Sequence, residues 1–217
     1  MRFGVDEAGK GPVLGSMFAA AVLAEPAALP AAVADSKRLA PDRREAIDDA
    51  LRASDEIAVG VAEVTPAEID DPETDMNTLT VAAQARAIAA IPAAGRAGLL
   101  DAGDVDAARF ARRVRERVDA DVELEAAHGA DAADPLVAAA SVVAKVARDD
   151  HVEALADAYD ADVGSGYPGD PTTIAFLEEY LDRHGSLPED ARTTWSTSER
   201  LVARAEQSGL EEFSASR

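Results

Sequence analysis

Four acidic residues follow or precede short apolar segments, where their side chains could do chemistry together. Asp6 and Glu7 end the apolar start of the chain, RFGVDE, and Asp101 directly follows AGLL. Asp131 stands in HGADAADPL, just before a long apolar segment. An acid that follows a buried strand tends to lie at a sheet edge where ligands bind. We therefore expect these carboxylates to gather at one place.

Four converging carboxylates would repel one another and would not all stay ionised without cations. Hard oxygen ligands suit Mg²⁺ or Mn²⁺, and two such ions can promote an in-line displacement at phosphorus. The alternative is coincidence, because the chain has 42 acidic residues. Adjacent strand residues also face opposite sides, so Asp6 and Glu7 share a site only if the strand ends or bulges between them.

The loop GKGPVLG, with glycines at 9, 11 and 15, follows the acidic pair. One interpretation is a dinucleotide-binding loop with Asp35 holding a ribose, although the spacing departs from G-x-G-x-x-G. A second is a set of backbone amides that touch a sugar-phosphate. A third is a tight hairpin turn, which glycine permits.

Apolar periodicity and turn residues predict the elements that must position these groups. Strands are expected at 2–7, 13–23, 56–64, 97–101 and 121–127, the first two as a hairpin. Helices are expected at 41–53, 75–91, 106–118, 135–159, 171–184 and 196–207. This order predicts an α/β fold, with a sheet covered by helices and a small helical C-terminal part.

The charge balance is the strongest global feature. Asp and Glu number 42 against 21 Lys and Arg, a net charge of −21, and lysine occurs only at positions 10, 37 and 145. Hydrophobic residues make up 47% of the chain, which excludes disorder as the meaning of the charge. We expect a halophilic, cytoplasmic protein whose self-repulsion is screened by salt. There is no cysteine, and no segment is predicted to span a membrane.

Six segments, in order, resemble the motifs of ribonuclease HII, the type 2 ribonuclease H family, and its archaeal branch in particular. They are GVDEAGKGPVLGSM, DSKRL, LDAGDV, ADAADPLVAAASVVAKVARDD, GSGYPGDPTT and RTTWST. The resemblance implies a ribonuclease H-like mixed sheet flanked by helices, with a helical C-terminal extension. We expect a catalytic domain at 1–165, a helical subdomain at 166–206 and a tail at 207–217.

The implied activity is hydrolysis of the RNA strand of RNA–DNA hybrids, and cleavage 5′ to single ribonucleotides embedded in duplex DNA. The products would carry 5′-phosphate and 3′-hydroxyl ends. Rival hypotheses are a dinucleotide-dependent oxidoreductase and a non-catalytic acidic protein associated with a sliding clamp. A duplex containing one ribonucleotide, tested with and without Mn²⁺, distinguishes the three.

The resemblance also implies roles for individual residues. The four acids would be catalytic and would bind two ions, Mg²⁺ or Mn²⁺. Tyr167 would stack on the sugar beside the ribonucleotide. The loop residues that would touch the backbone and sense the 2′-hydroxyl are Gly9, Lys10 and Gly11. Many members have arginine where Lys10 stands, which keeps the charge and loses the planar fork.

Other polar residues have two interpretations each. Ser36 and Lys37 would contact phosphate, or Ser36 would cap a helix. Lys145 and Arg148, one helical turn apart, would support the site or contact phosphate, or would pair with nearby acids.

The C-terminal QSGLEEF has the spacing of a sliding-clamp interaction peptide, with Gln207, Leu210 and Phe213 as anchors. The alternative is the last turn of an amphipathic helix. We expect the chain to be a monomer.

Overall fold

The computed structural model describes residues 1–33 and 40–215, with side chains up to residue 207 in the last helix. The chain forms two compact units. Unit 1 comprises Met1–Lys10, Met17–Val64 and Thr74–Asp149, and unit 2 comprises Gly11–Ser16, Thr65–Glu73 and Asp150–Arg217. The domain boundaries expected after residues 165 and 206 stay a prediction. Within the described residues, no helix has the length and apolar character needed to cross a membrane.

Unit 1 is built on a mixed five-stranded sheet in the order β3-β2-β1-β4-β5. Strand β2 is antiparallel to both β1 and β3, while β4 is parallel to both β1 and β5. The strands are β1 Arg2–Ala8, β2 Met17–Ala24, β3 Ala58–Val64, β4 Arg96–Asp101 and β5 Val122–Ala127. The predicted α/β class and mixed sheet are confirmed.

The hairpin of β1 and β2 is continuous from Arg2↔Ala24 to Ala8↔Phe18. The glycine loop therefore joins two antiparallel strands and does not lead from a strand into a helix, so the dinucleotide-loop hypothesis is wrong. The second strand begins at Met17, later than the predicted residue 13. Val13 and Leu14 instead donate their N–H groups to the carbonyl of Gly166 in unit 2, at 2.8 and 3.2 Å.

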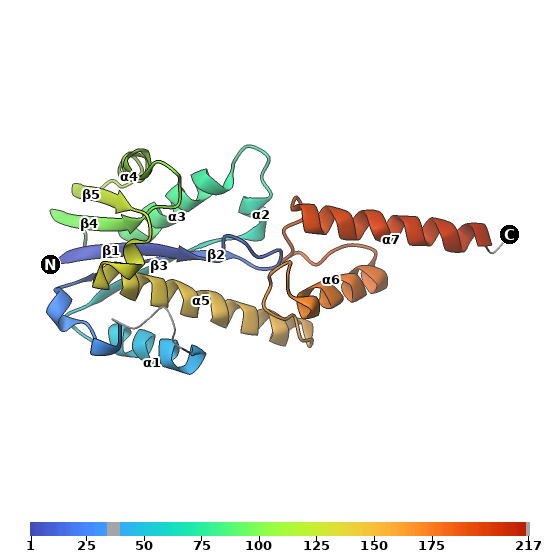
Figure 1. The fold of residues 1–217 in the computed structure, drawn as a ribbon, viewed down its shortest axis with the longest axis horizontal. Helices are drawn as coiled ribbons and strands as arrows, with labels where there is room; N and C mark the ends of the chain where they lie inside the picture. Colours follow the sequence, from blue (N-terminus) through green and yellow to red (C-terminus); the bar gives the residue numbers. More distant parts are fainter. Residues whose placement is uncertain (34–39, 216–217) are drawn as a thin grey trace. The chain divides into compact units, whose positions relative to one another are not determined.

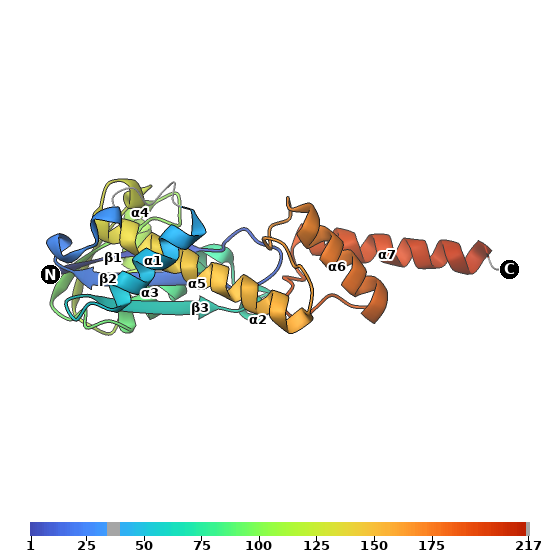
Figure 2. The same ribbon diagram turned by 90° about the horizontal axis from the view of Figure 1, so that it is seen from below.

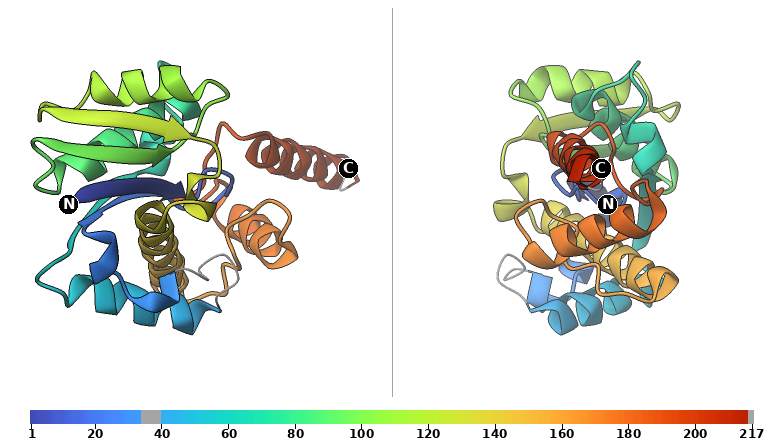
Figure 3. Two further views of the ribbon diagram at one scale, coloured as in Figure 1. Left: turned by 60° about the vertical axis from the view of Figure 1, so that its left-hand side comes forward. Right: turned by 90° about the vertical axis from the view of Figure 1, so that its right-hand side faces the viewer.

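Helices cover both faces of the sheet (Figure 1). One face carries α1 (Pro41–Arg52) and the first part of α5 (Pro135–Tyr159), which lie in front of the strands in Figure 2. The other carries α3 (Met76–Ala89) and α4 (Ala107–Arg115), and the left view of Figure 3 shows the same layering.

Small residues let α5 lie close to the sheet. A Cβ added to Gly4 of β1 would stand 2.2 Å from the Val137 nitrogen, so only glycine fits there. Alternate β2 residues, Ala20, Val22 and Ala24, are buried against α1 and α5. This packing fixes the start of α5 over β1.

Unit 2 contains α2 (Pro66–Ile69), α6 (Pro171–His184) and α7 (Ser196–Ala215). Trp195 packs on this unit's apolar cluster and lies over the buried Arg192, 5.2 Å from its guanidinium carbon, as expected of a packing residue. The last helix is longer than the predicted 196–207. Its C-terminal part is rich in strong helix formers, and Gly209 alone costs about 1 kcal/mol there.

Candidate active site

Three of the four predicted acids stand where β1 and β4 end. The pairing of these parallel strands stops at Val5↔Leu100, so Asp6, Glu7 and Asp101 lie just beyond it. β1 itself continues with regular register, Asp6 opposite Ala20 and Glu7 opposite Ala19. The strand thus neither ends nor bulges between the two acids. They point to opposite faces, Asp6 toward Ser141 of α5 and Glu7 toward Gln84 of α3. The expectation that the two acids could share a site only through a bulge is therefore wrong, because the Glu7 charge raises the pKa of Asp6 across a regular strand.

Asp6 lies on the α5 face and is only 6% exposed. Its carboxylate accepts hydrogen bonds from the Ser141 hydroxyl and, at 2.7 Å, from the Glu7 N–H. Burial and the Glu7 charge raise the pKa of Asp6 to about 7, Asp101 adds to the rise, and the Ser141 bond opposes it. Lys145 donates to the Ser141 hydroxyl at 2.8 Å, so its ammonium reaches Asp6 only through that serine.

Glu7 lies on the α3 face among hydrogen-bond donors. Its Oε2 accepts a bond from Gln84 Nε2 at 2.7 Å, and its Oε1 lies 3.7 Å from Lys10 Nζ. Lys10 also donates to the Gly103 carbonyl at 3.0 Å. A Cβ on Gly103 would stand 3.2 Å from Glu7 Oε1 and 3.3 Å from Lys10 Nζ, so glycine leaves room for the pair. Burial raises the pKa of Glu7, and Lys10 opposes that rise.

Asp101 is the last residue of β4, and its register places it on the same face as Asp6. Its Oδ1 accepts the Ala130 N–H at 2.7 Å. Ala130 opens the short helix η3 (Ala130–Ala132), which follows Gly129 at φ 62°. Asp131 is the next residue, so this turn brings the fourth acid to the end of the sheet where the other three lie.

The donor set suits a divalent cation. The acidic side chains offer only oxygen ligands, and the repulsion that raises the pKa of Asp6 is what a cation relieves. Among the described residues, no three acidic or histidine side chains already stand in the arrangement of a metal site. Their oxygens are instead bonded to Gln84, Ser141 and the Ala130 amide.

The predicted substrate-binding residues fall into both units. Gly9, at φ 88°, and Lys10 belong to unit 1. Gly11 and Tyr167 belong to unit 2, where a ring carbon of Tyr167 would lie 3.3 Å from a Cβ on Gly11. Tyr167 is 41% exposed, as a stacking residue needs to be.

The remaining predictions have mixed outcomes. Arg148 forms an ion pair with Asp149 at 3.0 Å, as its structural interpretation expected. Ser36 and Lys37 lie outside the described residues. Gln207 is exposed on α7, while Leu210 and Phe213 are described only as helical backbone.

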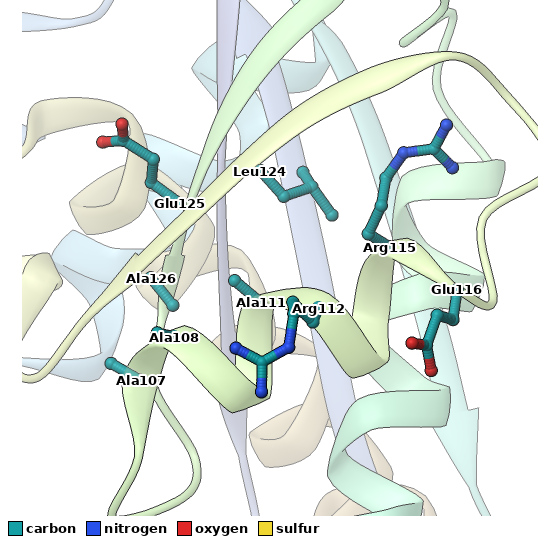
Figure 4. A pocket seen from close by; sticks show the side chains of 9 residues that line it. All are labelled: Ala107, Ala108, Ala111, Arg112, Arg115, Glu116, Leu124, Glu125 and Ala126. Carbon is teal, nitrogen blue, oxygen red and sulfur yellow. The ribbon is translucent and has the colours of Figure 1, made fainter.

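A groove of about 700 Å³ lies elsewhere in unit 1, between α4 and β5 (Figure 4). Alanines and Leu124 line it, with Arg112 and Arg115 beside them. None of the four acids contributes to this lining, so the groove is separate from the carboxylates at the strand ends.

Two residues of the site had not been predicted from the sequence. Gln84 and Ser141 are both buried, and each bonds one acid of the β1 pair. The available signal was a polar residue inside an apolar run, VAAQARAIAA for Gln84 and VAAASVVA for Ser141. A buried polar side chain needs a partner, so each such residue points toward one.

Comparison with known proteins matches the chain to one family over most of its length. The family description Ribonuclease HII matches residues 3–198. A ribonuclease HII from the haloarchaeon Halobacterium salinarum is 65% identical over 212 residues, covering 98% of this chain and 99% of the relative.

Comparison with solved structures gives the same family. The ribonuclease H2 of Pyrococcus horikoshii has a TM-score of 0.83 and 35% identity, covering 93% of this chain and 97% of its own. The ribonuclease HII of Archaeoglobus fulgidus, solved in a complex with PCNA, has a TM-score of 0.79 and 33% identity, covering 93% and 96%.

Proposed function

This chain belongs to the ribonuclease HII family, and we propose that Asp6, Glu7, Asp101 and Asp131 are the residues that carry the family's reaction here. Members are metal-dependent endoribonucleases that cleave the RNA strand of RNA–DNA hybrids and cut at ribonucleotides embedded in duplex DNA. One observation supports this assignment most strongly. Asp6, Glu7 and Asp101 are buried or half-buried at the ends of β1 and β4, where the charge of Asp101 raises the pKa of both Asp6 and Glu7.

The four acids would hold two ions, Mg²⁺ or Mn²⁺. Bound divalent ions supply activation of the attacking water and neutralisation of charge at the scissile phosphate. The chain's contribution is to hold the ligands in place. Ser141 orients Asp6, Gln84 and Lys10 hold Glu7, and the Ala130 amide fixes Asp101.

The glycine loop and Tyr167 would recognise the substrate. Gly9 and Gly11 offer backbone without side chains, which suits close approach to a sugar-phosphate. The 2′-hydroxyl distinguishes RNA from DNA and must be read by a group at the site. The exposed Tyr167 ring offers a stacking surface for the neighbouring sugar. Cleavage 5′ to the ribonucleotide, with a 3′-hydroxyl end, is part of this proposal.

Lys10 and Lys145 would support the ligands from opposite faces of β1. Lys10 lies beside Glu7, and Lys145 lies behind Ser141. Ser36, Lys37 and Arg148 are proposed as phosphate contacts, and for Arg148 this requires a rearrangement of its ion pair with Asp149.

The C-terminal segment would bind a sliding clamp. The relative from Archaeoglobus fulgidus was solved with PCNA, which supports this partner for a member of the same family. Gln207, Leu210 and Phe213 provide one polar and two apolar anchors at the spacing of a clamp peptide. Removal of residues 207–217 should abolish clamp binding while leaving hydrolysis unchanged, and unchanged clamp binding would exclude this role.

A single assay tests the proposed catalytic acids. The substrate is a duplex with one ribonucleotide, in molar KCl, with and without Mn²⁺, because a protein of net charge −21 binds DNA poorly without salt screening. Asp101→Asn should lose cleavage. Asp106→Asn is the matched control, since asparagine keeps the N-cap that Asp106 provides to α4. Equal activity of wild type and Asp101→Asn would refute the assignment.

A further inference from the structure

Helix α3 places a fully buried glutamine directly behind the candidate ligands. Gln84 is 0% exposed. Its Nε2 donates one hydrogen bond to Glu7 Oε2, at 2.7 Å, and another to the main-chain carbonyl of Asp101, at 3.0 Å. One amide group therefore joins a side chain of β1 to the last peptide of β4.

This link lies where the sheet no longer connects the two strands. The pairing of β1 and β4 ends at Val5↔Leu100, one residue before Asp6 and Asp101. Beyond that point, main-chain hydrogen bonds between the two strands do not set the separation of Glu7 and Asp101. The Gln84 amide bonds both residues and therefore sets the separation of Glu7 and Asp101 there.

A buried glutamine is not the most stabilising residue for this position. Both neighbours of the Gln84 amide are acceptors, so only its NH₂ can face them. Its Oε1 is left buried with no hydrogen-bond partner among the described residues. A buried acceptor without a partner destabilises the folded state, and an apolar side chain of similar length avoids that cost.

We propose that Gln84 is a positioning residue that fixes the Glu7 carboxylate relative to Asp101 for divalent-metal binding. The inference rests on the proposed function, in which both acids are metal ligands. Gln84 acts through Glu7, by holding one of its oxygens, and through the Asp101 main chain. Groups that orient metal ligands in this way commonly contribute 10–100-fold to metal affinity.

The test compares Gln84→Met with Thr80→Val in the full-length chain. Methionine keeps the length of the side chain and removes both donors. Thr80 is the matched control, because it is fully buried one turn earlier in α3 and its hydroxyl donates to the Met76 carbonyl of its own helix, at 2.6 Å. Mn²⁺ affinity is measured by titration calorimetry in molar KCl without substrate, and folding by thermal melting followed by circular dichroism.

Gln84→Met should bind Mn²⁺ about tenfold more weakly, while Thr80→Val binds it like the wild type. At saturating Mn²⁺ the KM for a single-ribonucleotide duplex should be unchanged in both. An unchanged Mn²⁺ affinity in folded Gln84→Met would overturn the proposal. If Gln84→Met does not fold, Gln84→Asn replaces it, since its shorter amide cannot reach both acceptors, and the same loss is expected.

Glu7→Gln separates this inference from the proposed function. If Glu7→Gln binds Mn²⁺ as well as the wild type, the ligand assignment of Glu7 fails, and the role of Gln84 fails with it. If Glu7→Gln weakens binding while Gln84→Met does not, the positioning role alone is refuted. The loss of Mn²⁺ affinity in the double variant should be smaller than the product of the two single losses, because both variants break the same link between Glu7 and Asp101.

Discussion

Asp6 and Glu7, on opposite faces of β1, have different hydrogen-bond and charge partners. On the α3 face, Glu7 has a cation at 3.7 Å, Lys10, and an amide donor, Gln84. On the α5 face, Asp6 accepts hydrogen bonds from the neutral Ser141 hydroxyl and a backbone N–H, and Lys145 is one hydrogen bond further away, behind Ser141. The strand alternation that separates the two side chains thus gives each its own electrostatic environment.

This difference shows how one strand end can hold two buried acids, one beside a cation and one beside neutral donors. Burial raises the pKa of Glu7, and Lys10 opposes that rise. Burial and the Glu7 charge raise the pKa of Asp6 to about 7, and no cationic side chain contacts Asp6 among the described residues. The folded protein therefore holds Asp6 near the point of protonation until a cation compensates its charge. In the proposed function both acids hold the metal ions, and the removal of Asp6 should also change the stability of the metal-free protein.

The largest expected effect is on turnover, where the two faces should behave alike. Asp6→Asn and Glu7→Gln should each lower kcat about 10³-fold, because a metal ion contributes several kcal/mol to the transition state and each 1.36 kcal/mol is tenfold. Single-turnover cleavage of a single-ribonucleotide duplex measures this. Glu123→Gln, an exposed acid in β5, is the control and should retain full activity. A large difference between the two site variants would assign the ions to one face only.

A smaller effect is expected on the stability of the metal-free protein when Asp6 is replaced. Asp6 loses its proton near its ordinary pKa of 3.8 in the unfolded chain and near 7 in the folded one. Between these values the folded state binds more protons, so the free energy of unfolding falls as pH rises. Asp6→Asn removes this fall and should stabilise the metal-free protein above pH 7, by up to about 4 kcal/mol.

Urea unfolding in molar KCl with a chelator, at pH 4 and pH 8, measures that gain. Asp6→Asn should match the wild type at pH 4 and exceed it at pH 8. Glu7→Gln should also gain at pH 8, because burial raises the pKa of Glu7 as well. No gain at pH 8 for Asp6→Asn would contradict the account of a buried Asp6 carboxylate that lacks a direct counter-charge.

The smallest expected effect comes from the two lysines. Lys10→Met should raise the pKa of Glu7, since a direct counter-charge is lost. The acid limb of the pH–rate profile should therefore move to higher pH, with about a tenfold loss of kcat/KM at neutral pH. Lys145→Met acts through Ser141 and should move the profile less. Lys10→Arg should keep the wild-type profile. A larger shift for Lys145→Met would reverse the comparison.

The sequence predicts the strand-end acids because an acid directly after an apolar run is an unusual and local pattern. It also predicts α5 from Pro135 to Tyr159, where Pro135 stands at the start of a long apolar segment. It does not place Gln84, because an alanine-rich helix gives little sign of which face is buried. The start of β2 depends on Val13 and Leu14 bonding Gly166, 152 or more residues away.

A local sequence motif marks the start of α2. Thr65-Pro66-Ala67-Glu68 is a capping box, and the structure shows both of its bonds at the start of α2. The motif alone could have located that helix. The opposite orientation of Asp6 and Glu7 followed from strand alternation, but only the continuous register to Ala8 shows that the strand neither ends nor bulges there.

The central claim is that acids from both faces of β1 and from the end of β4 hold the ions together. A crystal grown with Mn²⁺ in molar salt, with anomalous data collected at the manganese edge, tests it most directly. The account predicts manganese peaks within coordination distance of Asp6, Glu7 and Asp101. Manganese bound only at other acids, with these three carboxylates uncoordinated, would contradict it.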